Sequence, residues 1–167
     1  MTQSRVLSKV SRGDGTLSSD LVTSHALIRA TENDTAVLLA IEETAKDLIV
    51  YSWGFTDSEF LEWINTDIVY LIEEDGVMVG DISYVVKDND YAYISGLVIK
   101  PEFQRRGLAR KAMTLLMEEL NDFRRLGLDV HPDNHAVKLY ESLGFVATER
   151  KENFYGDGQP RIIMVKE

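Results

Sequence analysis

Over residues 68–99 the apolar residues no longer follow helical spacing, and turn-forming residues interrupt the segment at two places. Asp75–Gly76 is typical of a two-residue hairpin turn in which both residues need a positive φ angle. Asp88–Asn89–Asp90 turns the chain a second time. The pattern therefore predicts a three-stranded antiparallel meander, with strands over Ile68–Glu74, Val77–Val86 and Tyr91–Ile99.

The segments before the meander predict a strand and two helices. Residues 26–30 fit a short strand, and helical spacing of apolar residues extends from a cap at Asn33 or Asp34 to about residue 46. Thr56 and Glu59 form a capping box that opens a second, short helix. Both helices precede the first strand of the meander.

After the meander, strands and helices are mixed. Helical spacing covers 107–125 and ends at Gly127, and a short strand over 128–131 precedes a helix that starts at Asp133 or Asn134. Two final strands cover 145–150 and 161–166. The order predicts an α+β fold with a mixed, mostly antiparallel sheet of six to seven strands and about four helices.

Composition limits the class of protein. The 167 residues fit one domain over 25–167, and the polar residues 1–24 read as a flexible arm. The absence of cysteine excludes disulfides, thiolate metal sites and an acyl-cysteine intermediate, and no apolar run is long enough to span a membrane. The net charge of −10 argues against nucleic acid as a partner, and it either favours a cationic substrate or serves solubility alone. We expect a cytoplasmic protein without a metal, either a monomer or a homodimer.

The segment Leu97–Lys111 carries the chemistry. A strand ends, a short loop follows, and a long helix begins at Gly107, where unpaired N–H groups and the helix dipole favour an anion. The small residue Ala109 leaves room for a ligand. Between Lys100 and Lys111 there are five basic residues and one acidic residue in an otherwise acidic chain. This pattern predicts a polyphosphate site; the alternative is a helix end that is basic only because it faces solvent.

The same residues resemble the acetyl-CoA signature of the GNAT superfamily of N-acetyltransferases. The loop matches as Gln104-x-x-Gly107-x-Ala109, and a second motif runs from Asn134 through Leu-Tyr-Glu to Gly-Phe. The C-terminal segments also look like those of the ribosomal-protein alanine N-acetyltransferases. The resemblance implies a three-layer α/β/α fold and acetyl-CoA as co-substrate. It implies cofactor contacts from Leu97, Val98, Ile99, Gln104, Arg105, Arg106, Gly107, Leu108, Ala109, Arg110, Asn134 and Tyr140, with the backbone N–H of Val98 on the thioester carbonyl.

The resemblance also implies catalytic roles. Tyr140 matches the family tyrosine that protonates the leaving thiol, and it also fits an apolar helix stripe. Asp129 stands where the alanine N-acetyltransferases carry a catalytic glutamate, and is the candidate base. His131, Tyr93 or a water molecule are alternatives.

The second motif departs from the family pattern. Six positions separate Asn134 from Tyr140, where the family has seven, so either Asn134 or Asp133 contacts the cofactor arm. The predicted function is acetyl transfer to a primary amine: a protein N-terminus, a lysine side chain or a small cationic amine. A non-catalytic acetyl-CoA-binding sensor or scaffold is the alternative.

Overall fold

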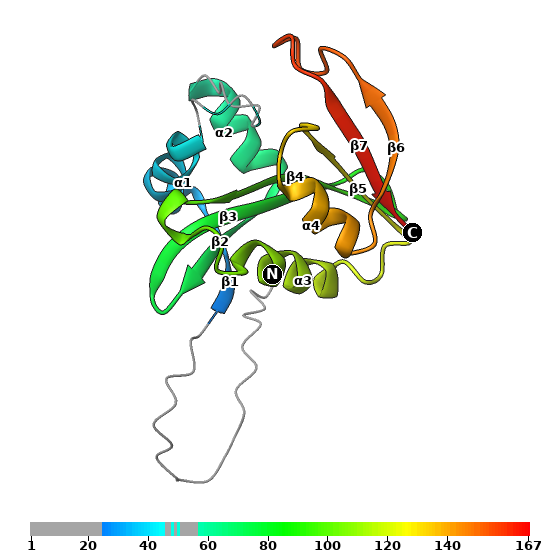
Figure 1. The fold of residues 1–167 in the computed structure, drawn as a ribbon. Coiled ribbons are helices and arrows are strands. Elements are labelled where there is room, and N and C mark those ends of the chain that lie inside the picture. The colour runs from blue at the N-terminus through cyan, green and yellow to red at the C-terminus, as the bar shows by residue number, and fades with distance from the viewer. Residues whose placement is uncertain (1–24, 46–47, 49, 51–56) are drawn as a thin grey trace, which may run out of the picture.

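The fold is built on one seven-stranded sheet (Figure 1). The structure is a computed structural model that describes residues 25–45, 48, 50 and 57–167. The strands lie in the order β1-β2-β3-β4-β5-β7-β6, and only the β4–β5 pair is parallel. Their bounds are β1 His25–Arg29, β2 Ile68–Glu74, β3 Val77–Val86, β4 Tyr91–Ile99, β5 Arg125–Val130, β6 Val146–Lys151 and β7 Arg161–Lys166.

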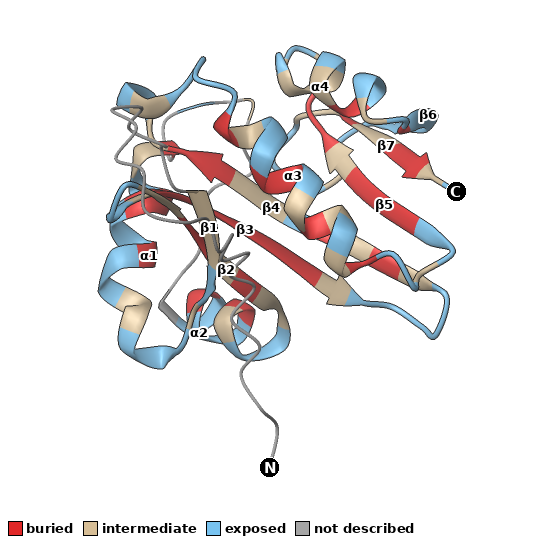
Figure 2. Ribbon diagram, turned by 90° about the horizontal axis from the view of Figure 1, so that it is seen from below, coloured by how far each residue is buried: buried red, intermediate tan, exposed pale blue. Residues whose placement is uncertain are grey.

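In the described part of the chain, four α-helices cover the two faces of this sheet (Figure 2). Side chains of α3 and α4 enter one buried cluster against the sheet, and side chains of α1 and α2 enter a second cluster on the other face. The three-layer, mostly antiparallel fold expected from the sequence is therefore confirmed. The helices are α1 Thr35–Glu42, α2 Asp57–Thr66, α3 Leu108–Glu119 and α4 Ala136–Ser142, with short 3-10 turns η1 Glu32–Asp34, η2 Glu43–Ala45 and η3 Pro101–Phe103.

The turns of the meander form as their residues predict. Asp75 and Gly76 have φ angles of 50° and 81°, which match a hairpin turn with both central residues in the left-handed region. Gly144 follows α4 with a φ of 91°, and so ends that helix in the left-handed conformation.

Three predicted boundaries are wrong. Helix α3 ends at Glu119 and not near residue 125, and Gly127 lies inside β5, where it pairs with Tyr93 and Val165. A Cβ at residue 127 would lie 2.2 Å from the Tyr91 hydroxyl, so the glycine makes room for a ring on the neighbouring strand. Helix α4 starts at Ala136, and α1 ends at Glu42 before a 3-10 turn.

Two predictions fall outside the described residues. They are the arm over 1–24 and the capping residue Thr56. The arm and the single domain over 25–167 stay predictions.

Strands β4 and β5 make the feature that positions the site. Their parallel ladder pairs Tyr91–Ile94 with Arg125–Leu128 and goes no further. β4 nevertheless continues to Ile99 and β5 to Val130. The two strands therefore part at their carboxyl ends and leave an opening between them.

Candidate active site

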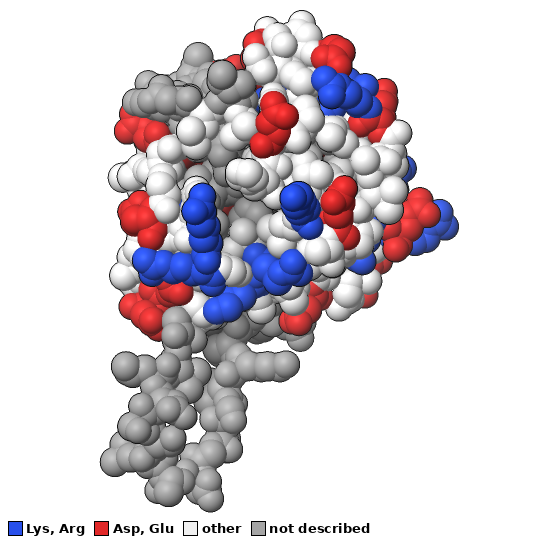
Figure 3. All heavy atoms as spheres, viewed as in Figure 1, with Lys and Arg blue, Asp and Glu red and all other residues white. Residues whose placement is uncertain are grey.

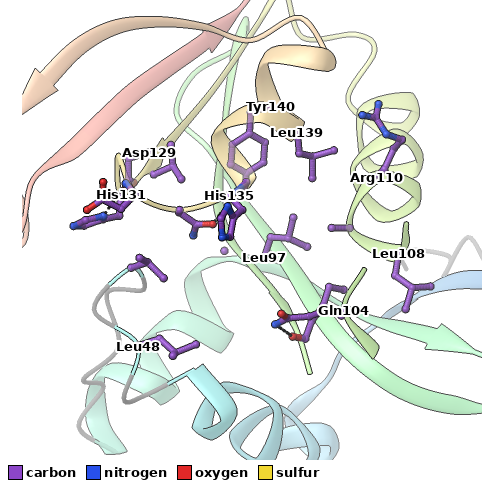
Figure 4. Close-up of a pocket in the computed structure, with 18 of the residues that line it drawn as sticks. Leu48, Leu97, Gln104, Leu108, Arg110, Asp129, His131, His135, Leu139 and Tyr140 are labelled. Atoms are coloured by element: carbon purple, nitrogen blue, oxygen red, sulfur yellow. Dashed lines mark hydrogen bonds between the residues drawn. The ribbon is translucent and has the colours of Figure 1, made fainter. Parts of the chain in front are cut away.

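A cavity of about 840 Å³ occupies the opening between β4 and β5 (Figure 4). Gln104, Leu108 and Arg110 lie at one end of the cavity, and Asp129 and His131 lie at the other. Tyr140 on α4 and His135, the residue just before that helix, lie between these two ends. One continuous space thus connects the start of α3 with the end of β5.

The loop before α3 has the backbone shape of an anion site. Arg105 and Gly107 have φ angles of 62° and 79°, both in the left-handed region. Successive N–H groups in such a turn form a concave surface that favours anions, and the first N–H groups of α3 add to it. Gln104 Nε2 donates to the Ile99 carbonyl at 2.9 Å and ties the loop to the end of β4. No atom lies within 4 Å of a Cβ added at Gly107, so the space above it is open.

Basic side chains gather around this end of the cavity (Figure 3). Arg110 Nη2 donates to Ser142 Oγ at 2.6 Å, so this guanidinium bridges α3 and α4 at the cavity wall. Arg106 turns the other way. Its Nη2 donates to the Glu102 carbonyl at 2.9 Å, its Nη1 lies 3.6 Å from Glu74, and the residue does not line the cavity.

The backbone of β4 presents alternate N–H groups to the opening. Lys100 N donates to the Val79 carbonyl at 2.9 Å. Hydrogen-bonded pairs alternate along an antiparallel ladder, and Asp81 pairs with Val98 two positions earlier, so the N–H of Val98 points to β3. Val98 is also buried and does not line the cavity. The N–H groups of Leu97 and Ile99 point to the open side instead, which differs from the expectation for Val98.

Asp129 lies in a dense polar network at the other end. Its Oδ1 accepts hydrogen bonds from the phenols of Tyr93 at 2.6 Å and Tyr155 at 2.7 Å. Its Oδ2 lies 3.8 Å from Nε of Arg161, whose side chain is 1% exposed. Arg161 Nη2 also donates to Asp157 at 3.2 Å, so the guanidinium joins β5 to the segment between β6 and β7. A buried arginine with two carboxylate partners is compensated, and removal of one partner would be costly.

The alternative bases are less suited to the role. Burial, and then the neighbouring Asp129 carboxylate, raise the pKa of Tyr93 far above its ordinary value, so this phenol keeps its proton. Nδ1 of His131 accepts the backbone N–H of Asp133 at 3.1 Å, which places the proton of a neutral ring on Nε2. That nitrogen lies 3.3 Å from Oε1 of Gln159. Both ring nitrogens of His131 are therefore already engaged.

The altered spacing between Asn134 and Tyr140 leaves the tyrosine in the cavity. Asn134 Oδ1 accepts from the N–H of Ala136 at 2.9 Å, which turns the chain into α4, and Tyr140 follows four residues after Ala136 on that helix. Tyr140 is buried, packs against Phe145 with ring centroids 6.1 Å apart, and lines the cavity. Asn134 and Asp133 both line it as well.

Comparison with known proteins identifies the family. The acetyltransferase (GNAT) family model matches residues 38–145, which is more than half of the chain. The chain belongs to this family. Members of the family use acetyl-CoA as co-substrate.

Two relatives and one solved structure carry the same enzyme name. An [Ribosomal protein bS18]-alanine N-acetyltransferase from Haemophilus ducreyi is 30% identical over 74% of this chain and 84% of its own length. The enzyme of that name from Salmonella typhimurium is 36% identical over 53% of this chain, and the matched part spans 61% of its length. The crystal structure of the Escherichia coli ribosomal-protein-S18-alanine N-acetyltransferase superposes with a TM-score of 0.72 at 25% identity, covering 86% of this chain and 93% of that one.

Most of the site residues expected from the sequence meet in the cavity of this GNAT fold. Of the thirteen residues given binding or catalytic roles, all except Val98 and Arg106 line it. Sequence reasoning missed Ser95, Tyr155 and Arg161, which also line it. A charged residue at the start of an otherwise apolar strand, Arg161–Ile162–Ile163–Met164, was the one local signal for the buried arginine.

Two structural findings concern metal ions and membranes. In the described ranges 25–45, 48, 50 and 57–167, no group of three or more His, Asp or Glu side chains is arranged to hold a metal ion. No helix within those same ranges combines the length and apolar character needed to cross a membrane.

Proposed function

We propose that this chain transfers the acetyl group of acetyl-CoA to the α-amine of a protein N-terminus that begins with alanine. The observation that carries the proposal is the single cavity that joins the anion-favouring start of α3 to Tyr140 and Asp129. The names of the relatives support alanine as the acceptor residue. The net charge of −10 supports a positively charged acceptor.

The start of α3 would hold the pyrophosphate of the coenzyme. The N–H groups of the segment from Gln104 to Arg110 supply donors, and Arg105 and Arg110 add positive charge at the cavity wall. Leu97 and Ile99 line the cavity along β4, and their N–H groups would pair with the pantetheine arm and polarise the thioester carbonyl. Alignment of this kind supplies on the order of 7–11 kcal/mol of barrier reduction for well-placed reactants.

Tyr140 would act as the general acid. The amine attacks the thioester carbon, the C–N bond forms and the C–S bond breaks, and the Tyr140 phenol gives its proton to the departing sulfur. Asp129 is the candidate that orients the acceptor amine by accepting a hydrogen bond from it, because its carboxylate lies at the acceptor end of the cavity. Its action as the base stays a prediction.

A thiol-release assay on the purified chain tests the proposal. We would supply acetyl-CoA with a peptide that starts with alanine, and measure free CoA together with the peptide mass. The matched control is the same peptide with its α-amine already acetylated, which leaves any lysine side chain available. Release of CoA with the free peptide alone supports the α-amine, release with both points to lysine, and release only with spermidine or an amino sugar would refute a protein acceptor.

The second candidate is a non-catalytic acetyl-CoA-binding sensor, which the shortened Asn134–Tyr140 spacing favours. The position of Tyr140 in the cavity wall argues for the enzyme instead. Uptake of acetyl-CoA in calorimetry without CoA release from any amine would support the sensor.

A further inference from the structure

Ser95 and Asp129 lie opposite one another where β4 and β5 part. The last paired residues of the ladder are Ile94 and Leu128, so Ser95 and Asp129 are the next position on each strand. Both line the cavity. Tyr93 precedes Ser95 by two residues on β4, so the two side chains lie on the same face of the sheet, and the Tyr93 hydroxyl donates to Asp129. An amine that enters the opening therefore has Ser95 on one side and Asp129 on the other.

Ser95 belongs to a chain of hydrogen bonds that leads away from the cavity. Trp63 Nε1 donates to Ser83 Oγ at 3.3 Å, and Ser83 Oγ lies 2.9 Å from Ser95 Oγ. Ser95 Oγ donates to Oδ2 of Asp67. Asp67 lies between α2 and β2 and is only partly buried, so water reaches its carboxylate.

The direction of these hydrogen bonds follows from the number of protons. An ionised carboxylate only accepts, so Ser95 must use its single hydroxyl proton on Asp67. Ser83 must then donate to Ser95, and it can do so because the indole N–H of Trp63 only donates. Ser95 Oγ gives one hydrogen bond and accepts one, which leaves it one lone pair toward the cavity that it lines.

Both carboxylate oxygens of Asp129 already have partners. Its Oδ1 accepts from two phenols, and its Oδ2 faces the buried guanidinium of Arg161. Protonation of Asp129 would remove negative charge from beside an arginine that is 1% exposed. Asp67 has no such buried cation among its hydrogen-bond partners in the described part of the chain, which are the hydroxyls of Ser95 and Thr66.

We propose that Ser95 and Asp67 form the path by which the proton of the acceptor ammonium leaves the active site. The ammonium N–H gives its proton to Ser95 Oγ while the Ser95 hydroxyl proton moves to Asp67 Oδ2 and then to water. The neutral amine attacks, the C–N bond forms and the C–S bond breaks. Nitrogen loses a second proton as the amide forms, and this proton replaces the one that the Tyr140 phenol gives to the departing thiolate. This path rests on the acetyl transfer proposed above.

The test is the pH profile of kcat/KM between pH 6 and 9.5, measured with acetyl-CoA and the alanine peptide. Asp67→Asn is expected to lower kcat/KM about 100-fold at pH 7, the usual size of a general-base contribution. The deficit shrinks toward pH 9.5, because an α-amine with a pKa of about 8 then arrives neutral. Ser95→Ala gives the same profile, Ser95→Thr restores activity, and the double variant loses no more than either single variant. Acetyl-CoA affinity is unchanged in every variant.

Two variants serve as controls. Asp122→Asn removes the same charge from the exposed turn after α3 and leaves the profile unchanged. Asp129→Asn is expected to lower kcat/KM equally at all pH values, as loss of an orienting group does. A pH-independent loss in Asp67→Asn, or full activity, overturns the path. If the pH-dependent deficit appears in Asp129→Asn and not in Asp67→Asn, the path is also overturned, but the proposed acetyl transfer is not. A folded wild-type chain that releases no CoA overturns the proposed function and this path with it.

Discussion

At the α3 end of the cavity the binding groups come from the backbone, whereas at the Asp129 end they come from side chains on separate segments. Arg105, Gly107 and the first turn of α3 are contiguous, and two left-handed φ angles shape them. Asp129, Tyr93, Tyr155 and Arg161 lie on β5, on β4, between β6 and β7, and on β7. The α3 end should tolerate changes of side-chain chemistry and fail when its space is filled. The Asp129 end should show the reverse.

The largest effect is expected at Gly107. Gly107→Trp places an indole in the open space above the helix start and so abolishes acetyl-CoA binding in calorimetry. It also places a non-glycine residue at a φ of 79°, at a cost of about 1–2 kcal/mol. Gly107→Ala carries that strain without the bulk and should keep most of the affinity.

Gly76→Trp is the matched control for Gly107→Trp. Its φ is 81°, it has nothing within 4 Å of an added Cβ, and it lies in the β2–β3 turn away from the cavity. Acetyl-CoA affinity that survives in Gly107→Trp, or that is lost equally in Gly76→Trp, would show that the coenzyme is not held at the start of α3.

The same contrast explains what the sequence predicted. The α3 end was predictable because residues 97–111 form one continuous strand, loop and helix with a glycine where the φ angle is positive. Ser95, Tyr155 and Arg161 were not, because the fold brings them together from distant segments and no local spacing relates them. Gly127 was misread for the same reason. Position 127 requires a glycine because the Tyr91 ring on the neighbouring strand leaves no space for a Cβ, and not because a helix ends there.

The next effect is on stability at the Asp129 end. Arg161→Met leaves the Asp129 carboxylate, 8% exposed, without its cation, and should lower the free energy of unfolding by about 3 kcal/mol. Arg110→Met, an exposed arginine at the α3 end, should change it by less than about 0.5 kcal/mol. Urea denaturation measures both values.

A double variant tests the cause of the loss in Arg161→Met. Arg161→Met combined with Asp129→Asn removes both charges, and should cost clearly less than the sum of the two single variants. Strict additivity would mean that the pair contributes packing only, and would weaken the contrast between the two ends.

Tyr140→Phe comes third. It keeps the ring packed against Phe145 and removes only the hydroxyl, so kcat should fall about 100-fold while acetyl-CoA affinity stays within about twofold. Tyr84→Phe removes a hydroxyl that bonds Glu119 on the α3 face of the sheet, and should leave kcat unchanged. Equal turnover in the wild type and Tyr140→Phe would remove the acid role and favour the sensor.

The smallest effect concerns a buried carboxyl that lacks the donors that Asp129 has. Asp81 is fully buried, no donor among the described residues reaches either of its oxygens, and it lies within hydrogen-bonding reach of Glu42 on α1. Two carboxyl groups can bond only through a proton. Burial raises the pKa of Glu42 to about 7, and burial together with Glu42 raises the pKa of Asp81.

These raised pKa values predict how stability depends on pH. The folded state holds more protons than the unfolded state, so the contribution of this pair is complete below about pH 4 and is lost as the pH rises through 7. Asp81→Asn replaces the shared proton with an amide N–H that Glu42 accepts when ionised. Thermal unfolding should then show that the free energy of unfolding of Asp81→Asn, relative to that of the wild type, rises by about 2 kcal/mol between pH 5 and pH 8. Asp122→Asn, an exposed change of the same charge, should run parallel to the wild type. If Asp81→Asn runs parallel as well, the two carboxyls do not share a proton, and the lack of donors around Asp81 has no energetic consequence in this range.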